Sequence, residues 1–255
     1  MVKSISELFD ISGKTAVVTG ASSGLGQRMA RVFHGAGATV VIGARRLEKL
    51  EELASELGER IIPVACDVGN DADCEMLISA ANDTGSLDIL VNSAGTCDVG
   101  PAEHQSTSQF RHVIDINLNA TFVLAKLAAQ TMLEKGGGSI INISSALGIV
   151  ASSPIAQAGY CASKGGLLNL TRELAAQWAS RGVRVNAIAP GWFLSEMTDD
   201  MFADKRGMAF IERGCPIGRA GDPDELDGAL LFLASSASSY VIGQTISVDG
   251  GWTIR

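Results

Sequence analysis

Positive charge is scarce in this 255-residue chain. Twenty lysines and arginines stand against 28 aspartates and glutamates, which gives a formal net charge of −8 at pH 7. Proteins bind nucleic acids and anionic membranes through basic surfaces, because cations there displace the counterions of the phosphates. We therefore expect neither a nucleic acid nor a membrane as a partner.

Long hydrophobic runs are also missing. No stretch of about 18 consecutive apolar residues occurs, so no membrane span is predicted. The longest uncharged stretch, residues 136–163, is interrupted by serine, glycine, asparagine, glutamine and Pro154. Residues 1–14 carry charged side chains and lack the apolar core of a signal peptide. A cytoplasmic protein is the expectation.

Cysteine and histidine are few and irregularly spaced. The cysteines form no C-x-x-C pair, so a reduced, cytosolic protein is the simplest interpretation. The histidines nearest to a cysteine are His104 and His112, close to Cys97, but this spacing matches no zinc pattern. No metal site is expected. The five cysteines are Cys66, Cys74, Cys97, Cys161 and Cys215.

What the chain does contain is apolar sequence and glycine. Hydrophobic residues make up 46% of it, enough for a sizeable core, and 29 glycines indicate tight turns or close approach of the backbone to a ligand. Short β-branched runs recur, and most are apolar throughout. Such runs are typical of strands buried on both faces of a parallel sheet. The predicted strands are Thr15–Thr19, Thr39–Ile42, Ile61–Ala65, Asp88–Asn92, Ser139–Ser144, Arg184–Ile188 and Thr245–Val248.

Longer patterns with helical periodicity separate these runs. Two of them predict long helices at about residues 108–135 and 160–180. The alternation of strands and helices predicts a single α/β domain over residues 1–255. Its core would be a doubly wound, Rossmann-type parallel sheet of about seven strands with helices on both faces. Residues 191–221 are less regular, and we interpret them as a substrate lid or insertion.

A glycine-rich turn follows the first predicted strand. Glycine at a strand-to-helix turn lets a pyrophosphate approach the backbone, and the helix N-terminus supplies free N–H groups. The spacing is G-x-x-x-G-x-G rather than G-x-G-x-x-G. The residues expected to hold a dinucleotide here are Gly20, Ser22, Ser23, Gly24, Leu25 and Gly26.

The same turn fits a second motif. Residues 20–24 also match G-x-S-x-G, the nucleophile elbow of an α/β-hydrolase, with Ser22 as the nucleophile. That triad needs a histidine late in the chain, and none follows His112. The hydrolase therefore stays a remote alternative.

One of the two tyrosines, Tyr160, precedes Lys164 by one helical turn. The lysine ammonium favours tyrosinate, so we expect the pKa of the phenol to fall from about 10 toward neutral pH. Such a tyrosine can give a proton to a carbonyl oxygen or take one from an alcohol. Ser145 follows the fifth predicted strand, where its hydroxyl would point into the ligand crevice. Asn117, on the apolar face of its helix, is either a structural amide or the anchor of a proton-relay water.

These motifs occur in the order and at the intervals of a known family. The sequence resembles the short-chain dehydrogenase/reductases over nearly its whole length. Two departures are Ser93, where the family commonly has asparagine, and a slightly long interval between Ser145 and Tyr160. The matching residues are Thr19-Gly20-x-x-x-Gly24-x-Gly26, Asp67-Val68, Asn92-Ser93-Ala94-Gly95, Asn117, Ser145, Tyr160-x-x-x-Lys164, Pro190-Gly191 and Val248-Asp249-Gly250-Gly251.

The resemblance implies a role for most of these residues. Tyr160 would be the general acid and base, and Ser145 would bind the substrate oxygen. Lys164 would lower the pKa of the tyrosine and hold the nicotinamide ribose, while Asn117 would anchor the relay water. The remaining cofactor residues would be Asn92, Ala94 and Gly95 on the adenosine side, Asp67 and Val68 at the adenine, and Ile188, Pro190, Gly191 and Ser195 at the nicotinamide.

The end of the second predicted strand bears on which nicotinamide cofactor binds. NAD sites usually place an acid there for the ribose 2′-hydroxyl, whereas this chain has Ala44 followed by Arg45 and Arg46. Arginine pairs well with a 2′-phosphate, to which Ser22 and Ser23 could add hydroxyls. NADP(H) is therefore favoured over NAD(H). Alternatively, both arginines are solvated and pair with nearby glutamates.

The sequence thus predicts an enzyme that transfers a hydride between a nicotinamide and a small ketone or secondary alcohol. The resemblance leaves two specific activities open: a 3-oxoacyl reductase acting on acyl carrier protein or coenzyme A thioesters, and a keto-sugar or polyol dehydrogenase. Lys135 and Arg181 are candidates for docking an acidic carrier protein. Besides the hydrolase, a catalytically silent NADP sensor is the other remote alternative.

Apolar residues concentrate between positions 192 and 210. By position this stretch would close over the substrate, but the same residues could pack on the core or on a partner subunit. The resemblance also implies a homotetramer, the common assembly of the family. The apolar residues are Trp192, Phe193, Leu194, Met197, Met201, Phe202, Met208 and Phe210.

Overall fold

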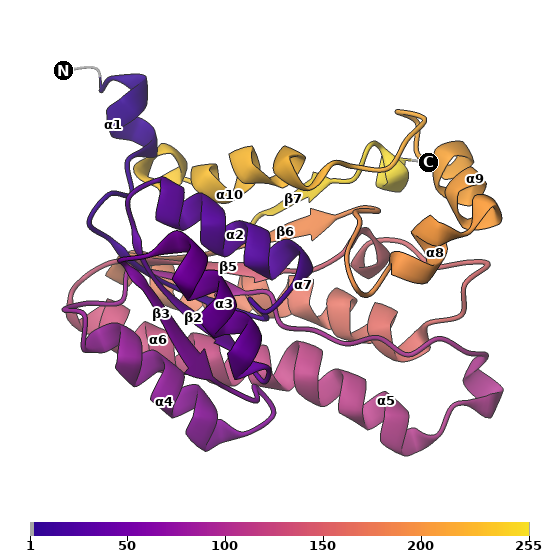
Figure 1. The fold of residues 1–255 in the computed structure, drawn as a ribbon, viewed down its shortest axis with the longest axis horizontal. Helices are drawn as coiled ribbons and strands as arrows, with labels where there is room; N and C mark the ends of the chain where they lie inside the picture. Colours follow the sequence, from indigo (N-terminus) through magenta and orange to yellow (C-terminus); the bar gives the residue numbers. More distant parts are fainter. Residues whose placement is uncertain (1–2, 255) are drawn as a thin grey trace.

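Seven parallel strands form one sheet in the computed structural model, which describes residues 3–254 (Figure 1). The strand order is β3-β2-β1-β4-β5-β6-β7, and every neighbouring pair is parallel. The predicted doubly wound α/β fold is confirmed. The strands are β1 Thr15–Thr19, β2 Thr39–Ala44, β3 Ile61–Ala65, β4 Ile89–Asn92, β5 Gly138–Ile143, β6 Val183–Pro190 and β7 Thr245–Val248.

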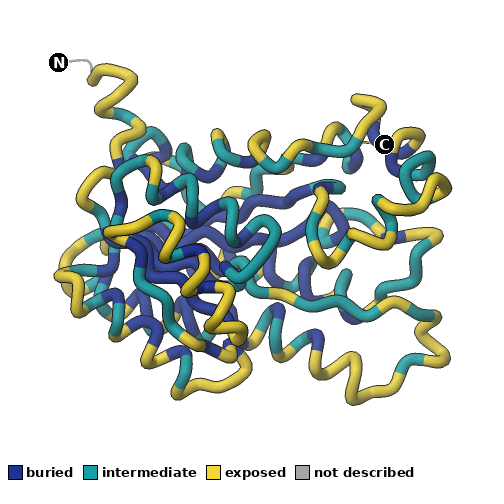
Figure 2. Tube along the Cα trace, in the orientation of Figure 1, coloured by how far each residue is buried: buried dark blue, intermediate teal, exposed yellow. Residues whose placement is uncertain are grey.

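The sheet is buried on both faces, which explains its continuous apolar runs. Along β1, Ala16 and Val18 join one core, whereas Val17 joins the core on the opposite face. Successive side chains of a strand point to opposite faces, so both sets of positions must be apolar. Figure 2 shows the inner strands as a buried centre of the molecule, while the edge strands β3 and β7 are partly exposed.

Helices cover the two faces. α2, α3 and α10 pack on one face through side chains such as Phe33 and Leu230. α4, α6 and α7 pack on the other through side chains such as Leu77 and Leu124. No helix within residues 3–254 is both long and apolar enough to cross a membrane. The helices are α1 Ile5–Phe9, α2 Gly24–Gly35, α3 Leu47–Leu57, α4 Asp71–Asn82, α5 Thr107–Ile114, α6 Ala120–Glu134, α7 Ala158–Trp178, α8 Asp199–Ala203, α9 Lys205–Gly214 and α10 Asp227–Ala234.

The helix predicted at about residues 108–135 is not one regular α-helix. A π-helical turn, η2 (Asp115–Asn119), separates α5 from α6. Asn117 lies in this turn and is 1% exposed. A π turn inserts one residue into the helix and re-aims the side chains beside it, and such turns concentrate at functional sites.

Residues 191–221, which we call the 191–221 segment, contain α8 and α9. The segment begins and ends side by side, because Phe193 and Gly221 form a β-bridge. Much of its apolar surface packs internally. Trp192, Phe210 and Trp252 make edge-to-face contacts with ring centroids 5.4–6.0 Å apart. Packing of Trp192 and Phe210 against each other and against Trp252 therefore accounts for part of the apolar character of this segment.

Candidate active site

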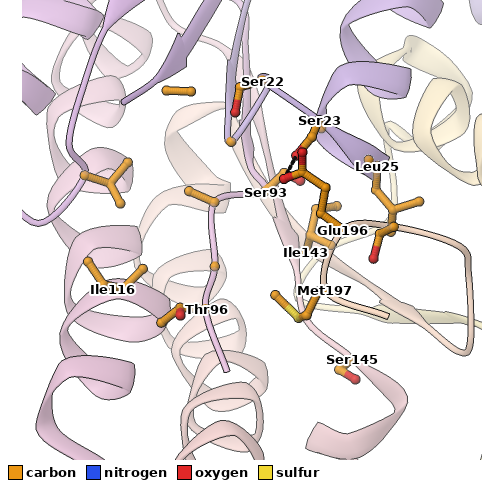
Figure 3. Close-up of a pocket in the computed structure, with 18 of the residues that line it drawn as sticks. Ser22, Ser23, Leu25, Ser93, Thr96, Ile116, Ile143, Ser145, Glu196 and Met197 are labelled. Atoms are coloured by element: carbon orange, nitrogen blue, oxygen red, sulfur yellow. Dashed lines mark hydrogen bonds between the residues drawn. The ribbon is translucent and has the colours of Figure 1, made fainter. Parts of the chain in front are cut away.

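A cavity of about 480 Å³ opens at the carboxyl ends of the central strands (Figure 3). The strand order reverses between β1 and β4, the position at which doubly wound sheets bind ligands. The volume of the cavity lies within the range of small-molecule sites. The wall is formed by the glycine turn after β1, the ends of β2 to β5, the first turns of α7, and residues 190–198.

At the glycine turn, backbone segments lie so close together that no side chain would fit on Gly20 or Gly26. Gly20 has φ +68°, and a Cβ on it would lie 2.8 Å from Cα of Ala94. A Cβ on Gly26 would lie 2.4 Å from the carbonyl oxygen of Gly20. α2 starts at Gly24, and no side chain caps the N–H groups of its first turn. These free N–H groups and the helix dipole suit a pyrophosphate.

Thr19 ties the end of β1 to the segment after β4. Its hydroxyl oxygen accepts hydrogen bonds from the backbone N–H groups of Ser93, at 3.0 Å, and Ala94, at 3.1 Å. The position of Ser93 is therefore fixed through its backbone. This contact does not depend on the side chain at position 93.

Ser145, Tyr160 and Lys164 converge on one wall of the cavity. Ser145 lies beside the phenol of Tyr160 and acts to lower its pKa, and its hydroxyl oxygen accepts from the N–H of Leu147 at 3.1 Å. Lys164 is 5% exposed and donates from Nζ to the carbonyl oxygen of Ile143 at 2.8 Å. Its Nζ lies 5.7 Å from the centroid of the Tyr160 ring. Spacing of four residues along α7 places the two side chains on one face, as the sequence predicted.

The pKa of Tyr160 differs from the sequence-based expectation. Burial raises the pKa of the phenol to about 12, against the opposing effect of Ser145. Burial also lowers the pKa of Lys164 to about 8. The predicted fall of the tyrosine pKa is therefore wrong for this structure. The Lys164 ammonium faces the Ile143 carbonyl and the ring, and desolvation is the largest cause of the raised pKa of the phenol.

A cluster of polar side chains occupies the opposite end of the cavity. Arg46 donates from Nη2 to Oγ of Ser22 at 3.0 Å and to Oγ of Ser23 at 3.1 Å. It also forms an ion pair with Glu196, with Nη2 and Oε2 2.8 Å apart. Arg45 lines the cavity beside it and is exposed. Both arginines thus line the cavity, and Arg46 pairs with a glutamate there.

Comparison with known proteins identifies the family. The family model described as enoyl-(acyl carrier protein) reductase matches residues 20–253. A 3-oxoacyl-(acyl-carrier-protein) reductase from Rickettsia prowazekii is 43% identical over 244 residues, which cover 96% of this chain and 98% of the relative. The chain belongs to the short-chain dehydrogenase/reductase family.

Other members of this family have different substrates in their names. A galactitol 2-dehydrogenase from Cereibacter sphaeroides is 38% identical and covers 97% of this chain and 98% of its own length. A gluconate 5-dehydrogenase from Burkholderia cenocepacia, solved in complex with NADP and tartrate, is 36% identical with a TM-score of 0.92. The alignment covers 98% of each chain. This short-chain dehydrogenase/reductase is therefore an oxidoreductase that acts on alcohol or ketone groups.

Most residues predicted for the short-chain dehydrogenase/reductase site line the cavity, but three do not. Asn92 is buried behind it and donates to Oδ1 of Asn142 at 2.9 Å. Asn117 accepts from the N–H of Thr96 at 2.8 Å and donates to its carbonyl, so its amide holds backbone. Ile188 is fully buried within the sheet. The predicted residues in the wall are Gly20, Ser22, Ser23, Gly24, Leu25, Gly26, Arg45, Arg46, Asp67, Val68, Ala94, Gly95, Ser145, Tyr160, Lys164, Pro190, Gly191 and Ser195.

Several residues in the wall are not among those predicted to bind the cofactor or to take part in catalysis. Glu196 lines the cavity and directly follows the predicted Ser195 in the sequence. This neighbouring position is the sequence signal that could have indicated it. Phe193 and Met197 are the members of the apolar stretch that reach the cavity. The other unpredicted wall residues are Ala44, Cys66, Ser93, Thr96, His112, Ile116, Ile143, Ser144 and Thr198.

The hydrolase alternative finds no support around Ser22. Its hydroxyl oxygen accepts from Nε and Nη2 of Arg46, at 3.3 and 3.0 Å. An arginine cannot take the proton of a serine nucleophile, since its pKa stays above about 12. Within residues 3–254, no group of three His, Cys, Asp or Glu side chains is placed to hold a metal ion.

Proposed function

We propose that this short-chain dehydrogenase/reductase interconverts a small ketone and a secondary alcohol with NADP(H), using Tyr160 as general acid and base. One observation carries the proposal. Ser145, Tyr160 and Lys164 lie in the same cavity as the arginine–serine cluster of Arg46. A proton donor for a carbonyl oxygen and donors for an anionic cofactor therefore face one enclosed space.

The chain's own side chains would divide the work of proton transfer. The hydroxyls of Ser145 and Tyr160 would both hydrogen-bond the substrate oxygen. The high pKa of Tyr160 keeps its phenol protonated at neutral pH, ready to donate as the oxygen gains charge. Lys164, charged below its pKa of about 8, would stabilise the tyrosinate that remains. Asn117 would fix the backbone at Thr96 beside the reacting atoms.

The cavity fits a nicotinamide dinucleotide. The turn at Gly20 and Gly26 has no room for side chains, and the uncapped start of α2 offers N–H groups to a pyrophosphate. Asp67 and Val68 would lie at the adenine, and Gly191 and Ser195 at the nicotinamide. When bound, the cofactor would supply or accept the hydride.

We infer a preference for NADP(H) over NAD(H) from the arginine–serine cluster. Ala44 ends β2 where an acid would bind a ribose 2′-hydroxyl, and Arg46 with Ser22 and Ser23 offers donors to a 2′-phosphate. The related gluconate 5-dehydrogenase from Burkholderia cenocepacia was solved with NADP.

For the substrate we propose a small hydroxylated ketone or polyol. Lys135, one cation considered for docking a carrier protein, donates to Oδ1 of Asp88 at 2.7 Å and to Ser86. Its charge is thus neutralised within the molecule, which favours a free substrate. The relatives named as 3-oxoacyl-(acyl-carrier-protein) reductases keep that class as the second candidate. NADPH consumption with a keto-gluconate and with acetoacetyl-CoA separates the two.

We further propose that the 191–221 segment is a substrate lid. We also propose that residues 1–255 form a single domain and that the protein is a cytoplasmic homotetramer. Phe193 and Met197, at the cavity wall, support the first point. Their apolar side chains would exclude water from the reacting atoms.

The test of the proposed function compares the two tyrosines of the chain. We expect Tyr160→Phe to lower NADPH-dependent turnover by roughly 10²-fold or more, while NADPH affinity changes little. Tyr240, which is 98% exposed, provides the matched control: Tyr240→Phe should leave turnover unchanged. Wild-type turnover in Tyr160→Phe would exclude the assignment. Wild-type protein that binds NADPH but turns over no carbonyl compound would instead support the silent sensor.

A further inference from the structure

Glu196 links the 191–221 segment to the predicted cofactor-selecting residues. Its carboxylate accepts hydrogen bonds from Arg46, Nη1 to Oε1 at 3.0 Å and Nη2 to Oε2 at 2.8 Å. The hydroxyl of Ser23 donates to Oε2 at 2.9 Å (Figure 3). Residues 150 positions apart in the sequence thus meet at one end of the cavity.

The carboxylate occupies donors that form an anion site. Two N–H groups of the Arg46 fork and one hydroxyl converge on it, and the arginine contact is bidentate, the geometry that arginine adopts with carboxylates and phosphates. Hydrogen bonds from Arg46 and then Ser23 hold the pKa of Glu196 below its usual value. The side chain is therefore an anion at neutral pH.

A cofactor 2′-phosphate would need the same donors. Glu196 occupies the bidentate edge formed by the two terminal nitrogens of Arg46, so a phosphate can bind through that edge only if the carboxylate withdraws. Two anions sharing one arginine also repel each other. A ribose 2′-hydroxyl is neutral and small, so it does not need to replace the Glu196 carboxylate on Arg46.

The position of Glu196 is coupled to the segment around it. The hydroxyl of Thr198 accepts from the N–H of Ser195 at 3.0 Å and donates to the carbonyl of Phe193 at 2.7 Å, which fixes the turn that carries Glu196. α8 starts at Asp199, directly after this turn. If the backbone at Glu196 moves when the carboxylate withdraws, the turn and the start of α8 would move together.

We propose that Glu196 is a specificity-determining residue that competes with the cofactor 2′-phosphate for Arg46 and Ser23. It thereby lowers the preference for NADP(H) over NAD(H). A bound 2′-phosphate would displace the carboxylate and, with it, the turn at residues 193–198, whereas a 2′-hydroxyl would not. This inference rests on the proposed binding of NADP(H), and it identifies Glu196 as a residue that weakens this binding.

The first experiment measures dissociation constants for NADPH and NADH by titration calorimetry. Glu196→Gln removes the charge while keeping the shape of the side chain. We expect NADPH to bind about three- to tenfold more tightly and NADH to change less than about twofold. Glu56→Gln, which breaks the surface ion pair with Arg31 outside the cavity, is the matched control and should change neither constant. An unchanged or reduced NADPH-to-NADH preference in Glu196→Gln would overturn the inference.

The second experiment uses fragments that separate the 2′-phosphate from the rest of the cofactor. We expect 2′,5′-ADP to increase amide hydrogen exchange in residues 195–203, whereas 5′-AMP should not, and Glu196→Gln should show the increased exchange without ligand. If 2′,5′-ADP binds but has the same effect as 5′-AMP, the role of Glu196 fails while NADP(H) binding stands. If 2′,5′-ADP does not bind the wild-type protein, the proposed 2′-phosphate site itself fails, and the inference with it.

Discussion

At the residue scale, burial sets the protonation states on which the proposed chemistry depends. Desolvation raises the pKa of Tyr160 to about 12 and lowers that of Lys164 to about 8. At neutral pH the pair is therefore a neutral phenol beside an ammonium ion, which is the state needed to protonate a carbonyl oxygen. Alcohol oxidation needs a tyrosinate, so the oxidation rate should rise with pH, while reduction should be favoured near neutral pH.

The lysine also makes stability depend on pH. Its pKa is about 8 in the folded protein and 10.5 in its reference state, so the unfolded chain binds more protons between these values. We expect the free energy of unfolding to rise by up to about 3 kcal/mol from pH 8 to 10.5, as the cost of the buried charge disappears. Lys164→Met should lack this rise, and Lys126→Met, at an exposed position on α6, should keep it. Chemical denaturation at several pH values measures the difference, and identical profiles for Lys164→Met and wild type would contradict it.

The two arginines after β2 should contribute unequally to cofactor choice. Ser22 and Ser23 hold Arg46 in place, whereas Arg45 is exposed and makes no hydrogen bond or ion pair to any described residue. We expect Arg46→Ala to weaken NADPH binding by about tenfold or more, with little effect on NADH. Arg45→Ala should have a smaller effect. Arg31→Ala is the control, and dissociation constants provide the measurement. A larger loss in Arg45→Ala would place the 2′-phosphate elsewhere.

At the element scale, close contact between two backbone segments, at Gly20 and at Gly26, fixes the start of α2. The close approach of Gly26 to the carbonyl of Gly20 places the first turn of the helix against the end of β1. Residues of that turn line the cavity, and its free N–H groups make no hydrogen bond to a capping side chain of the described residues.

One substitution in α2 should break this arrangement while another in the same helix should not. A Cβ at Gly26 would lie 2.4 Å from backbone oxygen, so we expect Gly26→Ala to lower stability by about 1–3 kcal/mol and to weaken NADPH binding at least tenfold. At Gly35 a Cβ meets nothing within 4 Å. Gly35→Ala should therefore bind NADPH normally and be neutral or up to about 1 kcal/mol more stable. Thermal unfolding and NADPH titration test both, and normal binding by Gly26→Ala would be inconsistent with this geometry.

At the scale of the whole molecule, apolar surface remains on the helices after both faces of the sheet are covered. Phe122 on α6 is 45% exposed, and Phe110 on α5 is 37% exposed. Large aromatic side chains at such positions are often buried when subunits associate. This surface supports the proposed homotetramer.

The assembly can be tested on α6. We expect the wild-type mass in solution to be close to four times the chain mass of 26.5 kDa. Phe122→Arg should give smaller species, because a buried charge at an interface is costly. Met76→Arg, at a 54% exposed position on α4, should leave the mass unchanged. Light scattering after size-exclusion chromatography reports all three, and a tetrameric Phe122→Arg variant would place the contact elsewhere.

Local sequence patterns were sufficient to predict the strands and several residues of the candidate site. Continuous apolar runs predicted all seven strands to within two residues at each end, because a strand buried on both faces tolerates few polar positions. The four-residue spacing of Tyr160 and Lys164 placed them on one helical face, because that spacing is close to one turn. Local rules of this kind need no knowledge of distant residues.

The environment of those residues depends on contacts made by the folded chain as a whole. The direction of the pKa shift of Tyr160 depends on the summed burial by many neighbours, and it opposes the effect of the single lysine that the sequence made visible. Asn117 bonds the backbone of Thr96, and Glu196 reaches Arg46, through contacts between segments far apart in the chain. Local patterns carry no information about such pairings, because packing of the helices and loops onto the sheet brings the partners together.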